Sequence, residues 1–257
     1  LTWDKRTSST HMAFSYKQSR PDGQYDVIIV GSGMSGSALA AILARDGWRC
    51  LVLERHYTPG GFTHTFTRRH YEWDVGVHYV GQMQGAGTLS KVMDYVTDGS
   101  LQWADMGDPY DCMWFGEQAF AFAKGRGQFV HRMKTYFPAA EDRKAIDAYM
   151  DLTVQAARSA GALFATRAVP PLINRMAGRI IARKAMPFAK RTTRSVLNSI
   201  TRNQQLIGVL TGQFGDYGLP PGRSSFLMHA ILFQHYLRGA YYPVGGAGRI
   251  FAAIEPI

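Results

Sequence analysis

Hydrophobic and polar positions in residues 25–61 follow the order strand, helix, strand. Residues 25–30 form a short apolar run rich in β-branched side chains, which is typical of a buried parallel strand. Small and apolar residues over 37–44 then predict a helix with an apolar stripe, and Gly47 ends it. A second apolar run at 50–53 predicts another buried strand. The pattern therefore predicts a βαβ unit within an α/β fold.

After residue 61, the hydrophobic pattern predicts short strands, followed by a helix and a hairpin. Residues 63–67 and 71–75 are expected to be strands, and the apolar spacing near 89–96 predicts one amphipathic helix. Residues 120–123 and 128–133 are separated by a Gly-Arg-Gly sequence and predict a hairpin.

The remaining chain is expected to be mostly helical. Pro138 is expected to open a long helix, and further helices are expected at about 194–211 and 224–238. These elements predict four segments: a tail at 1–24, a Rossmann-like nucleotide-binding domain at 25–134, a helical and basic segment at 135–240, and a return toward the first domain at 241–257.

Glycines follow the first predicted strand in the spacing G-x-G-x-x-G. Gly31 permits a tight turn, Gly33 lets the backbone approach a pyrophosphate, and Gly36 lets the helix pack closely on the strand. The helix N-terminus offers unpaired N–H groups to the phosphates. Glu54 ends the second strand, where it can accept hydrogen bonds from the adenosine ribose, and an acid there favours FAD or NAD over NADP.

A second glycine pair, Gly60 and Gly61, follows Pro59. This sequence forms either a plain turn or a stretch of backbone that passes close to a flavin, because only glycine leaves room there. Glycine clusters also make ordinary turns, but here the order strand, glycines, helix, strand and acid is complete. The sequence therefore predicts a dinucleotide-binding site.

Composition limits the other kinds of site. The chain has 257 residues, enough for one large or two small domains, and no apolar run long enough to span a membrane. Its two cysteines, Cys50 and Cys112, are isolated, which favours a reducing compartment over a disulfide framework. The histidines show no metal-binding spacing, so a metal site is not expected.

Charge is concentrated in one segment. Between Asp151 and Asp216 there is no acidic residue but there are ten basic ones, which equals the formal net charge of +10 for the whole chain. Apolar residues over 172–181 lie opposite Arg175 and Arg179 on a helical projection. Three interpretations remain: a solvated face, a peripheral membrane contact through 167–194, or, least favoured, a nucleic-acid surface, since few aromatic residues accompany the charges.

Two blocks of the sequence resemble a known family. The glycine motif, Glu54-Arg55, Gly60-Gly61, His64-Thr65-Phe66 and the run from Asp74 to Gly81 are similar to the start of phytoene desaturase-type flavoproteins. Within them, the chain most resembles the branch of retinol saturase (retinol 13,14-reductase) and carotenoid isomerase. Residues 210–246 resemble the same branch.

The resemblance implies an FAD-dependent oxidoreductase that acts on C=C bonds of an apolar polyene or isoprenoid lipid. NAD or NADP could serve as electron donor, and peripheral association with a membrane, on a cytoplasmic or organellar face, would fit such a substrate. Desaturation and cis-trans isomerisation of carotenoids remain alternatives, as does a non-catalytic remnant that keeps the nucleotide-binding fold. Members of this family continue beyond the last block, so the chain is expected to be an N-terminal portion.

The resemblance also suggests site residues. Gly76 is expected near the flavin ring, and His78 is the candidate for catalysis, with Tyr79, Tyr241 and Tyr242 as other proton donors. The alternative for His78 is a hydrogen-bonded core histidine. His229 and its neighbours Met228 and Phe233 are expected to pack a helix. The residues expected to bind the cofactor are Gly31, Gly33, Ser35, Gly36, Glu54, Arg55, Gly60, Gly61 and Gly76.

Overall fold

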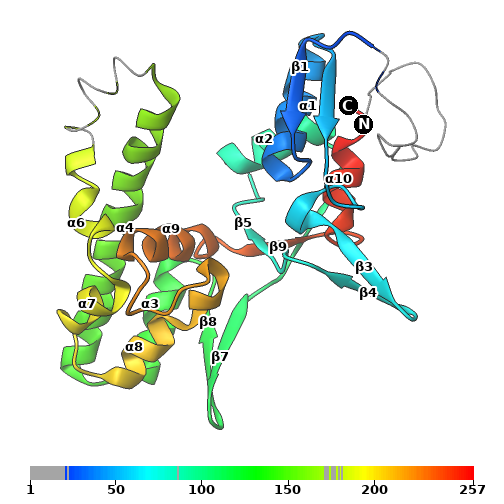
Figure 1. The fold of residues 1–257 in the computed structure, drawn as a ribbon. Coiled ribbons are helices and arrows are strands. Elements are labelled where there is room, and N and C mark those ends of the chain that lie inside the picture. Colours follow the sequence, from blue (N-terminus) through cyan, green and yellow to red (C-terminus); the bar gives the residue numbers. More distant parts are fainter. Residues whose placement is uncertain are drawn as a thin grey trace. The chain divides into compact units, whose positions relative to one another are not determined.

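The structure, a computed structural model, describes residues 21 and 23–257, except 86, 171–173, 175–177, 179 and 181. The chain forms two compact units (Figure 1). Unit 1 combines Leu1–Asp105 with Tyr241–Ile257, and unit 2 is the continuous stretch Met106–Ala240. Unit 1 thus ends before the expected boundary at 134, because the residues after Met106 form a hairpin and a helix that pack with the later helices.

Among its described residues, unit 1 contains a parallel strand pair, an antiparallel hairpin, a three-stranded sheet and three α-helices. In chain order its elements are β1 (Val27–Val30), α1 (Met34–Arg45), β2 (Cys50–Leu53), η1 (Gly61–Thr63), β3 (Thr65–Arg68), β4 (Tyr71–Asp74), β5 (Val80–Gly81), α2 (Thr88–Thr97), β6 (Trp103–Asp105), β9 (Ala240–Pro243) and α10 (Gly248–Ile254).

The predicted βαβ unit is confirmed. Strands β1 and β2 pair in parallel, with Val27 opposite Cys50 and Val30 opposite Leu53. Ile29 packs with α1, but Ile28 and Val30 are 61% and 86% exposed. The expectation that the first strand is buried is therefore wrong for Ile28 and Val30. In the described part of the chain β1 pairs with β2 alone, and α1 covers one face of that pair.

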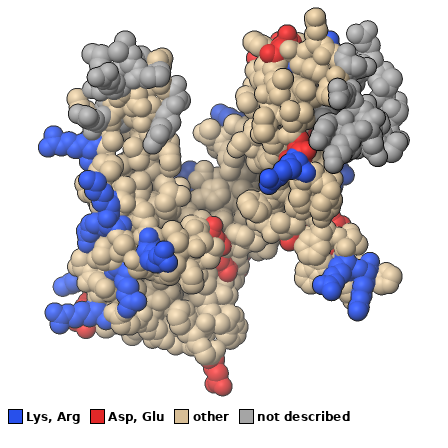
Figure 2. Space-filling model, viewed as in Figure 1, with Lys and Arg blue, Asp and Glu red and all other residues tan. Residues whose placement is uncertain are grey.

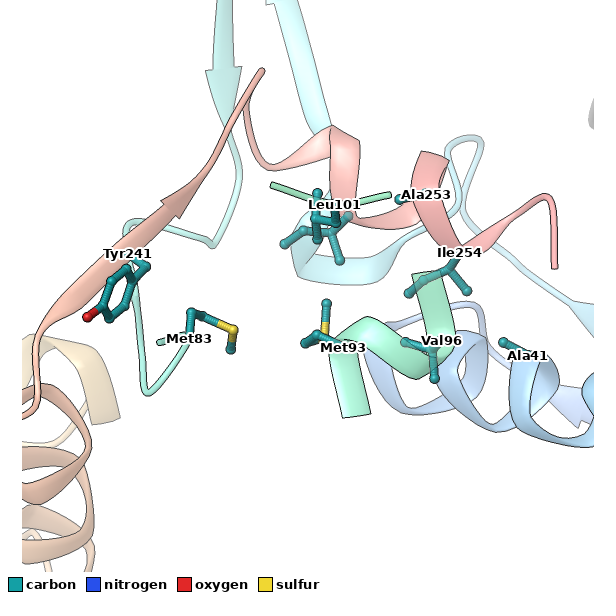
Figure 3. Packing of buried hydrophobic residues seen from close by; sticks show 9 residues of the cluster. Ala41, Met83, Met93, Val96, Leu101, Tyr241, Ala253 and Ile254 are labelled. Carbon is teal, nitrogen blue, oxygen red and sulfur yellow. The ribbon is translucent and has the colours of Figure 1, made fainter. Parts of the chain in front are cut away.

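The main core of unit 1 joins the two ends of the sequence. Figure 3 shows side chains from α1 and α2 packed with side chains that follow residue 240. Strand β9 pairs with β6, placing Tyr242 opposite Ala104. The buried members of this cluster are Ala41, Met83, Met93, Val96, Leu101, Tyr241, Ile250, Ala253 and Ile254.

Two further predictions for unit 1 are confirmed. The strands expected at 63–67 and 71–75 appear as the antiparallel pair β3 and β4, in which Phe66 lies opposite Trp73. The amphipathic helix expected near 89–96 is α2, whose apolar side buries Met93 and Val96. The β3–β4 hairpin extends away from the other elements of its unit (Figure 1).

Unit 2 is a helical assembly with one hairpin. Its described elements are β7 (Asp111–Phe115), β8 (Gln118–Phe122), α3 (Arg126–Tyr136), α4 (Ala140–Ala168), α6 (Met186–Ala189), α7 (Thr193–Asn198), α8 (Gln204–Leu210), η2 (Gly212–Tyr217) and α9 (Phe226–Tyr236). Its core is aromatic, since Phe233 of α9 packs edge-on against both Phe129 and Tyr149.

The expected hairpin of 120–123 with 128–133 is wrong. Strand β8 pairs instead with the preceding β7, and Phe120 lies opposite Met113. Residues 126–136 form α3, which buries Phe129 and Met133 on one side. These two positions are four residues apart, a spacing that a helix satisfies and that a strand would also allow. Packing against α4 selects the helix.

The long helix after Pro138 is confirmed as α4. The helix expected at 194–211 is wrong, because it divides into α7 and α8. Asn203 caps α8 by accepting hydrogen bonds from the N–H groups of Gln205 and Leu206. The Asp142 carboxylate holds the break by accepting a hydrogen bond from Asn203 at 2.8 Å. A polar side chain of α4 therefore fixes the residue at which α8 begins.

The apolar and basic face expected at 172–181, with Arg175 and Arg179, lies mostly outside the described residues. Among the described parts, Figure 2 shows Lys and Arg side chains gathered along the helical unit. None of the described helices is both long and apolar enough to cross a membrane.

Candidate functional site

The first glycine loop has the close packing that its spacing predicts. Gly31 has φ +97°, a conformation that favours glycine, and its N–H bonds to the Leu53 carbonyl at 2.7 Å. A Cβ atom at Gly36 would lie 2.0 Å from the Gly31 carbonyl oxygen, so no other residue fits there. Gly33 directly precedes the first turn of α1. The loop therefore turns sharply from β1 into the helix.

The second glycine pair lies against the first loop. Gly60 forms a parallel bridge with Gly33, and both Gly60 and Gly61 have positive φ, at +105° and +57°. A Cβ atom at Gly61 would lie 2.8 Å from the Gly33 Cα atom. The two glycine segments, far apart in the sequence, thus meet backbone to backbone at the N-terminus of α1.

Ser32 joins these parts, and the sequence reasoning missed it. Its side chain is fully buried. The hydroxyl group donates to the Glu54 carboxylate at 2.6 Å and accepts from the Gly60 N–H at 3.1 Å, while the Ser32 N–H donates to Glu54 at 2.8 Å. A hydroxyl between the first two glycines, followed by an acid at the end of the next strand, was the available signal.

Glu54 is held as a carboxylate. Partial burial alone would raise its pKa, but hydrogen bonds from the Ser32 hydroxyl and from the backbone N–H groups of His56, Ser32 and Arg55 outweigh that effect and lower the pKa to about 2. The His56 N–H bonds the second carboxylate oxygen at 2.7 Å. Glu54 is therefore negatively charged at neutral pH and is fixed in position at the end of β2.

Ser35 and Arg55 lie near this loop but are exposed. Ser35 is in the first turn of α1, and Arg55 directly follows Glu54. His56 stacks near Tyr57 and His64, with ring centroids 4.2 and 4.8 Å apart. No group of three or more His, Cys, Asp or Glu residues that could hold a metal ion occurs among the described residues.

Gly76 and His78 lie in the segment after β4. A Cβ atom at Gly76 would meet the Phe62 side chain at 2.7 Å, which gives this glycine a packing reason of its own. His78 is exposed, and its ring lies edge-on to Tyr79 at 4.5 Å. The alternative in which His78 is a core histidine is therefore wrong.

Asp74 connects this segment to the second family-like block. Its carboxylate accepts a hydrogen bond from the Tyr242 hydroxyl group and another from the Ala247 N–H at 3.2 Å. Burial and the hydrogen bond to Asp74 together raise the pKa of Tyr242 to about 12. The Tyr242 proton is therefore held between the two side chains at neutral pH.

Unit 2 contains one buried histidine. Both ring nitrogens of His229 form hydrogen bonds. Nε2 bonds the Tyr149 hydroxyl at 2.8 Å, and Nδ1 bonds the Tyr217 hydroxyl at 3.3 Å. Burial lowers its pKa to about 4. His229 and Phe233 pack the inside of α9, as predicted, but Met228 is exposed on the other side, so its expected packing role is wrong.

The chain is similar to known proteins over its whole length. Residues 29–96 match the NAD(P)-binding Rossmann-like domain family. The chain is 33% identical over 265 residues to the all-trans-retinol 13,14-reductase of Danio rerio, covering all of this chain and 43% of that protein. It is also 32% identical over 258 residues, or 97% of this chain and 42% of the relative, to an inactive all-trans-retinol 13,14-reductase of the same species.

Shorter and more distant matches agree with this result. A chloroplastic prolycopene isomerase of Arabidopsis thaliana is 34% identical over 91 residues, which is 34% of this chain and 15% of that protein. A solved putrescine oxidase has a TM-score of 0.58 at 17% identity, covering 91% of this chain and 49% of that one. At 17% identity, this structural similarity shows a shared fold only.

The chain spans 43% of the length of the Danio rerio reductase that it matches. The resemblance to the retinol saturase and carotenoid isomerase branch is confirmed, and so is the Rossmann-like fold. The chain therefore contains a Rossmann-like domain, whose residues 29–96 match the NAD(P)-binding Rossmann-like family, and it is similar to the all-trans-retinol 13,14-reductases along its whole length.

Proposed function

We propose that this chain is the dinucleotide-binding part of an FAD-dependent oxidoreductase that acts on C=C bonds of an apolar polyene or isoprenoid lipid, as an all-trans-retinol 13,14-reductase does. The observation that carries the proposal is the contact between the two glycine segments, Gly31–Gly36 and Gly60–Gly61, beside the charged Glu54. The similarity of the whole chain to the reductases supports the substrate class.

The residues present fit the ADP half of FAD. Gly36 and Gly61 leave no room for a Cβ atom, whereas Gly33 has only the Gly61 Cα near the position a Cβ would take. Backbone N–H groups at the start of α1 suit a pyrophosphate. After accepting from the Ser32 hydroxyl, the Ser32 N–H and the His56 N–H, Glu54 has one acceptor position left for a ribose hydroxyl, and its charge disfavours the extra phosphate of NADP at this site.

Bound FAD would supply the hydride chemistry, and the protein would position the substrate and move a proton. His78 is our candidate proton donor, since its ring is exposed beside Gly76. Asp74 would hold the Tyr242–Ala247 turn in place, and its bond to Tyr242 disfavours that tyrosine as the acid. The electron donor would be NAD or NADP.

A non-catalytic role is the second candidate, because one relative matching 97% of the chain is named as inactive. Carotenoid isomerisation is a third, supported by the prolycopene isomerases. All three proposals include a Rossmann-like nucleotide-binding fold. They differ in whether a bound flavin is retained and in whether the substrate gains hydrogen.

The first experiment is the absorbance spectrum of the purified chain after incubation with FAD and gel filtration. We expect a retained flavin spectrum, lost in Gly33→Val, because a β-branched side chain at Gly33 would enter the space beside Gly61. Gly161→Ala is the matched control, since nothing lies within 4 Å of a Cβ atom there. A folded chain that retains no FAD would contradict the proposal.

The second experiment tests the reaction. The flavin-loaded chain is reduced and incubated with all-trans-retinol or prolycopene, and the products are separated by chromatography. A dihydro product supports the reductase and a geometric isomer supports the isomerase. A protein that retains flavin but leaves both substrates unchanged supports the non-catalytic role.

A further inference from the structure

The β3–β4 hairpin has two chemically different faces. Phe66 lies opposite Trp73, and Arg68 lies opposite Tyr71. Because residues two apart in a strand share a face, these four side chains form one surface, here called the aromatic face. The other face carries Thr65, Thr67, Glu72 and Asp74. Aromatic and basic side chains are thus separated from the acidic ones.

The aromatic face points away from the rest of unit 1. On the opposite face, Asp74 binds Tyr242 and the Ala247 N–H, and Thr65 lies 3.3 Å from the position a Cβ atom would take at Gly248. On the aromatic face, Phe66, Tyr71 and Trp73 are 43%, 67% and 55% exposed. The polar face therefore anchors the hairpin, and the aromatic face is left exposed.

We propose that the aromatic face of the β3–β4 hairpin binds the surface of an anionic lipid bilayer. Tyr and Trp side chains are favoured at the boundary between headgroups and acyl chains, because each combines an apolar ring with a polar group. Arg68 and Arg69 lie at the end of the same hairpin, where their guanidinium groups can reach lipid phosphates while their stems follow the apolar surface.

Charge identifies the partner. From Phe66 to Tyr71 the hairpin has two arginines and no acid, and Glu72 lies on the other face. A second copy of the chain would place arginine near arginine across such a contact, whereas an anionic surface neutralises both. Proximity to lipid would also suit a polyene substrate. That last argument alone rests on the proposed function.

The test is sedimentation of the chain with phosphatidylcholine vesicles, with and without phosphatidylserine. We expect binding to the anionic vesicles that weakens with salt. Arg68→Gln with Arg69→Asn should lower the partition coefficient about fivefold for each charge removed. Phe66→Ser with Trp73→Ser should lower it at least roughly tenfold, because two aromatic anchors are lost. Trp114→Ser, at an exposed position of β7, is the matched control and should bind normally.

Trp73 fluorescence provides a second readout, in which the hairpin itself is left unchanged. In a background in which Trp3, Trp48, Trp103 and Trp114 are replaced by Phe, anionic vesicles should shift the Trp73 emission to the blue, and brominated lipids should quench it. Unchanged emission with unchanged sedimentation of the hairpin variants would overturn the proposal. Binding lost only on neutralising Arg183, Lys184 and Lys190 would assign it to the basic segment instead. Vesicle-free self-association, abolished by Phe66→Ser, would show a second copy as the partner.

Sedimentation needs neither flavin nor substrate. A chain that binds vesicles but not FAD would support the membrane-binding hairpin and contradict the proposed function. A chain that binds FAD but not vesicles would support the proposed function and contradict the membrane-binding hairpin. The two can therefore fail separately.

Discussion

The Ser32 hydroxyl group donates a 2.6 Å hydrogen bond to the Glu54 carboxylate and so ties the first glycine loop to the end of the second strand. The same oxygen accepts the Gly60 N–H. One buried serine thus fixes the relative positions of both glycine segments and of the acid. A side chain of this kind determines the geometry of a site while it remains buried.

Ser32→Ala should reduce the free energy of unfolding by about 1 to 3 kcal/mol, because it removes a hydrogen bond to a charged group and leaves the Gly60 N–H without its acceptor. The affinity for FAD should also fall, because Ser32 positions Glu54 and Gly60. Denaturant unfolding and flavin titration measure the two effects. Ser35→Ala, at an exposed position of α1, should leave stability within about 0.5 kcal/mol of the original protein.

Glu54 should contribute to acid sensitivity. Its folded pKa of about 2 lies below its ordinary value of 4.5, so the unfolded chain binds more protons between these values and stability falls as pH is lowered through that window. Glu54→Gln should flatten this part of the stability profile and weaken FAD binding. Chemical unfolding at a series of pH values between 2 and 5 tests it. An unchanged slope in the variant would assign the acid sensitivity to other carboxyl groups.

Asp74→Asn should cost about 1 to 2 kcal/mol of stability, because the amide cannot accept from both Tyr242 and the Ala247 N–H as the carboxylate does. Tyr242→Phe should cost a similar amount. Since both changes break the same contact, the double variant should lose less than the sum of the two single losses. Additive losses, measured by urea unfolding, would show that the pair is not coupled.

His229 should make unit 2 sensitive to mild acid. Its folded pKa of about 4 lies below the ordinary value of 6.5, so protons bind more readily to the unfolded chain and stability falls as pH decreases from 6.5 toward 4. The expected loss at pH 5 is about 2 kcal/mol from this group. His229→Gln should reduce the slope of Tm against pH in this window, even if its Tm at neutral pH is lower. His131→Gln, at an exposed position of α3, should leave the slope unchanged.

Much of the nucleotide-binding unit could be predicted because its constraints are local. The spacing of Gly31, Gly33 and Gly36 is set by one turn, and the strand that follows ends at Glu54 within the same unit of structure. Ser32 was missed because its partners, Glu54 and Gly60, are 22 and 28 residues away and come together only through the fold.

The errors have the same origin. Phe129 and Met133 are four residues apart, a spacing that a strand also allows, and only packing against α4 selects the helix α3. The break before α8 depends on Asp142, which is 61 residues from Asn203. Ile28 and Val30 were expected to be buried because their side chains are apolar. Their burial depends instead on which strands and helices cover them. Local pattern predicts an element, and long-range packing decides its ends and its exposure.

The discontinuity of unit 1 has a consequence for how the chain acquires its structure on the ribosome. Met93 and Val96 emerge before unit 2, but Ile250 and Ile254, which complete their cluster, emerge only after it. Residues 106–240 form unit 2 without interruption, so this later unit can finish folding first. Until residues 250–254 are made, the core beside the glycine loops therefore stays incomplete, and α10 completes it.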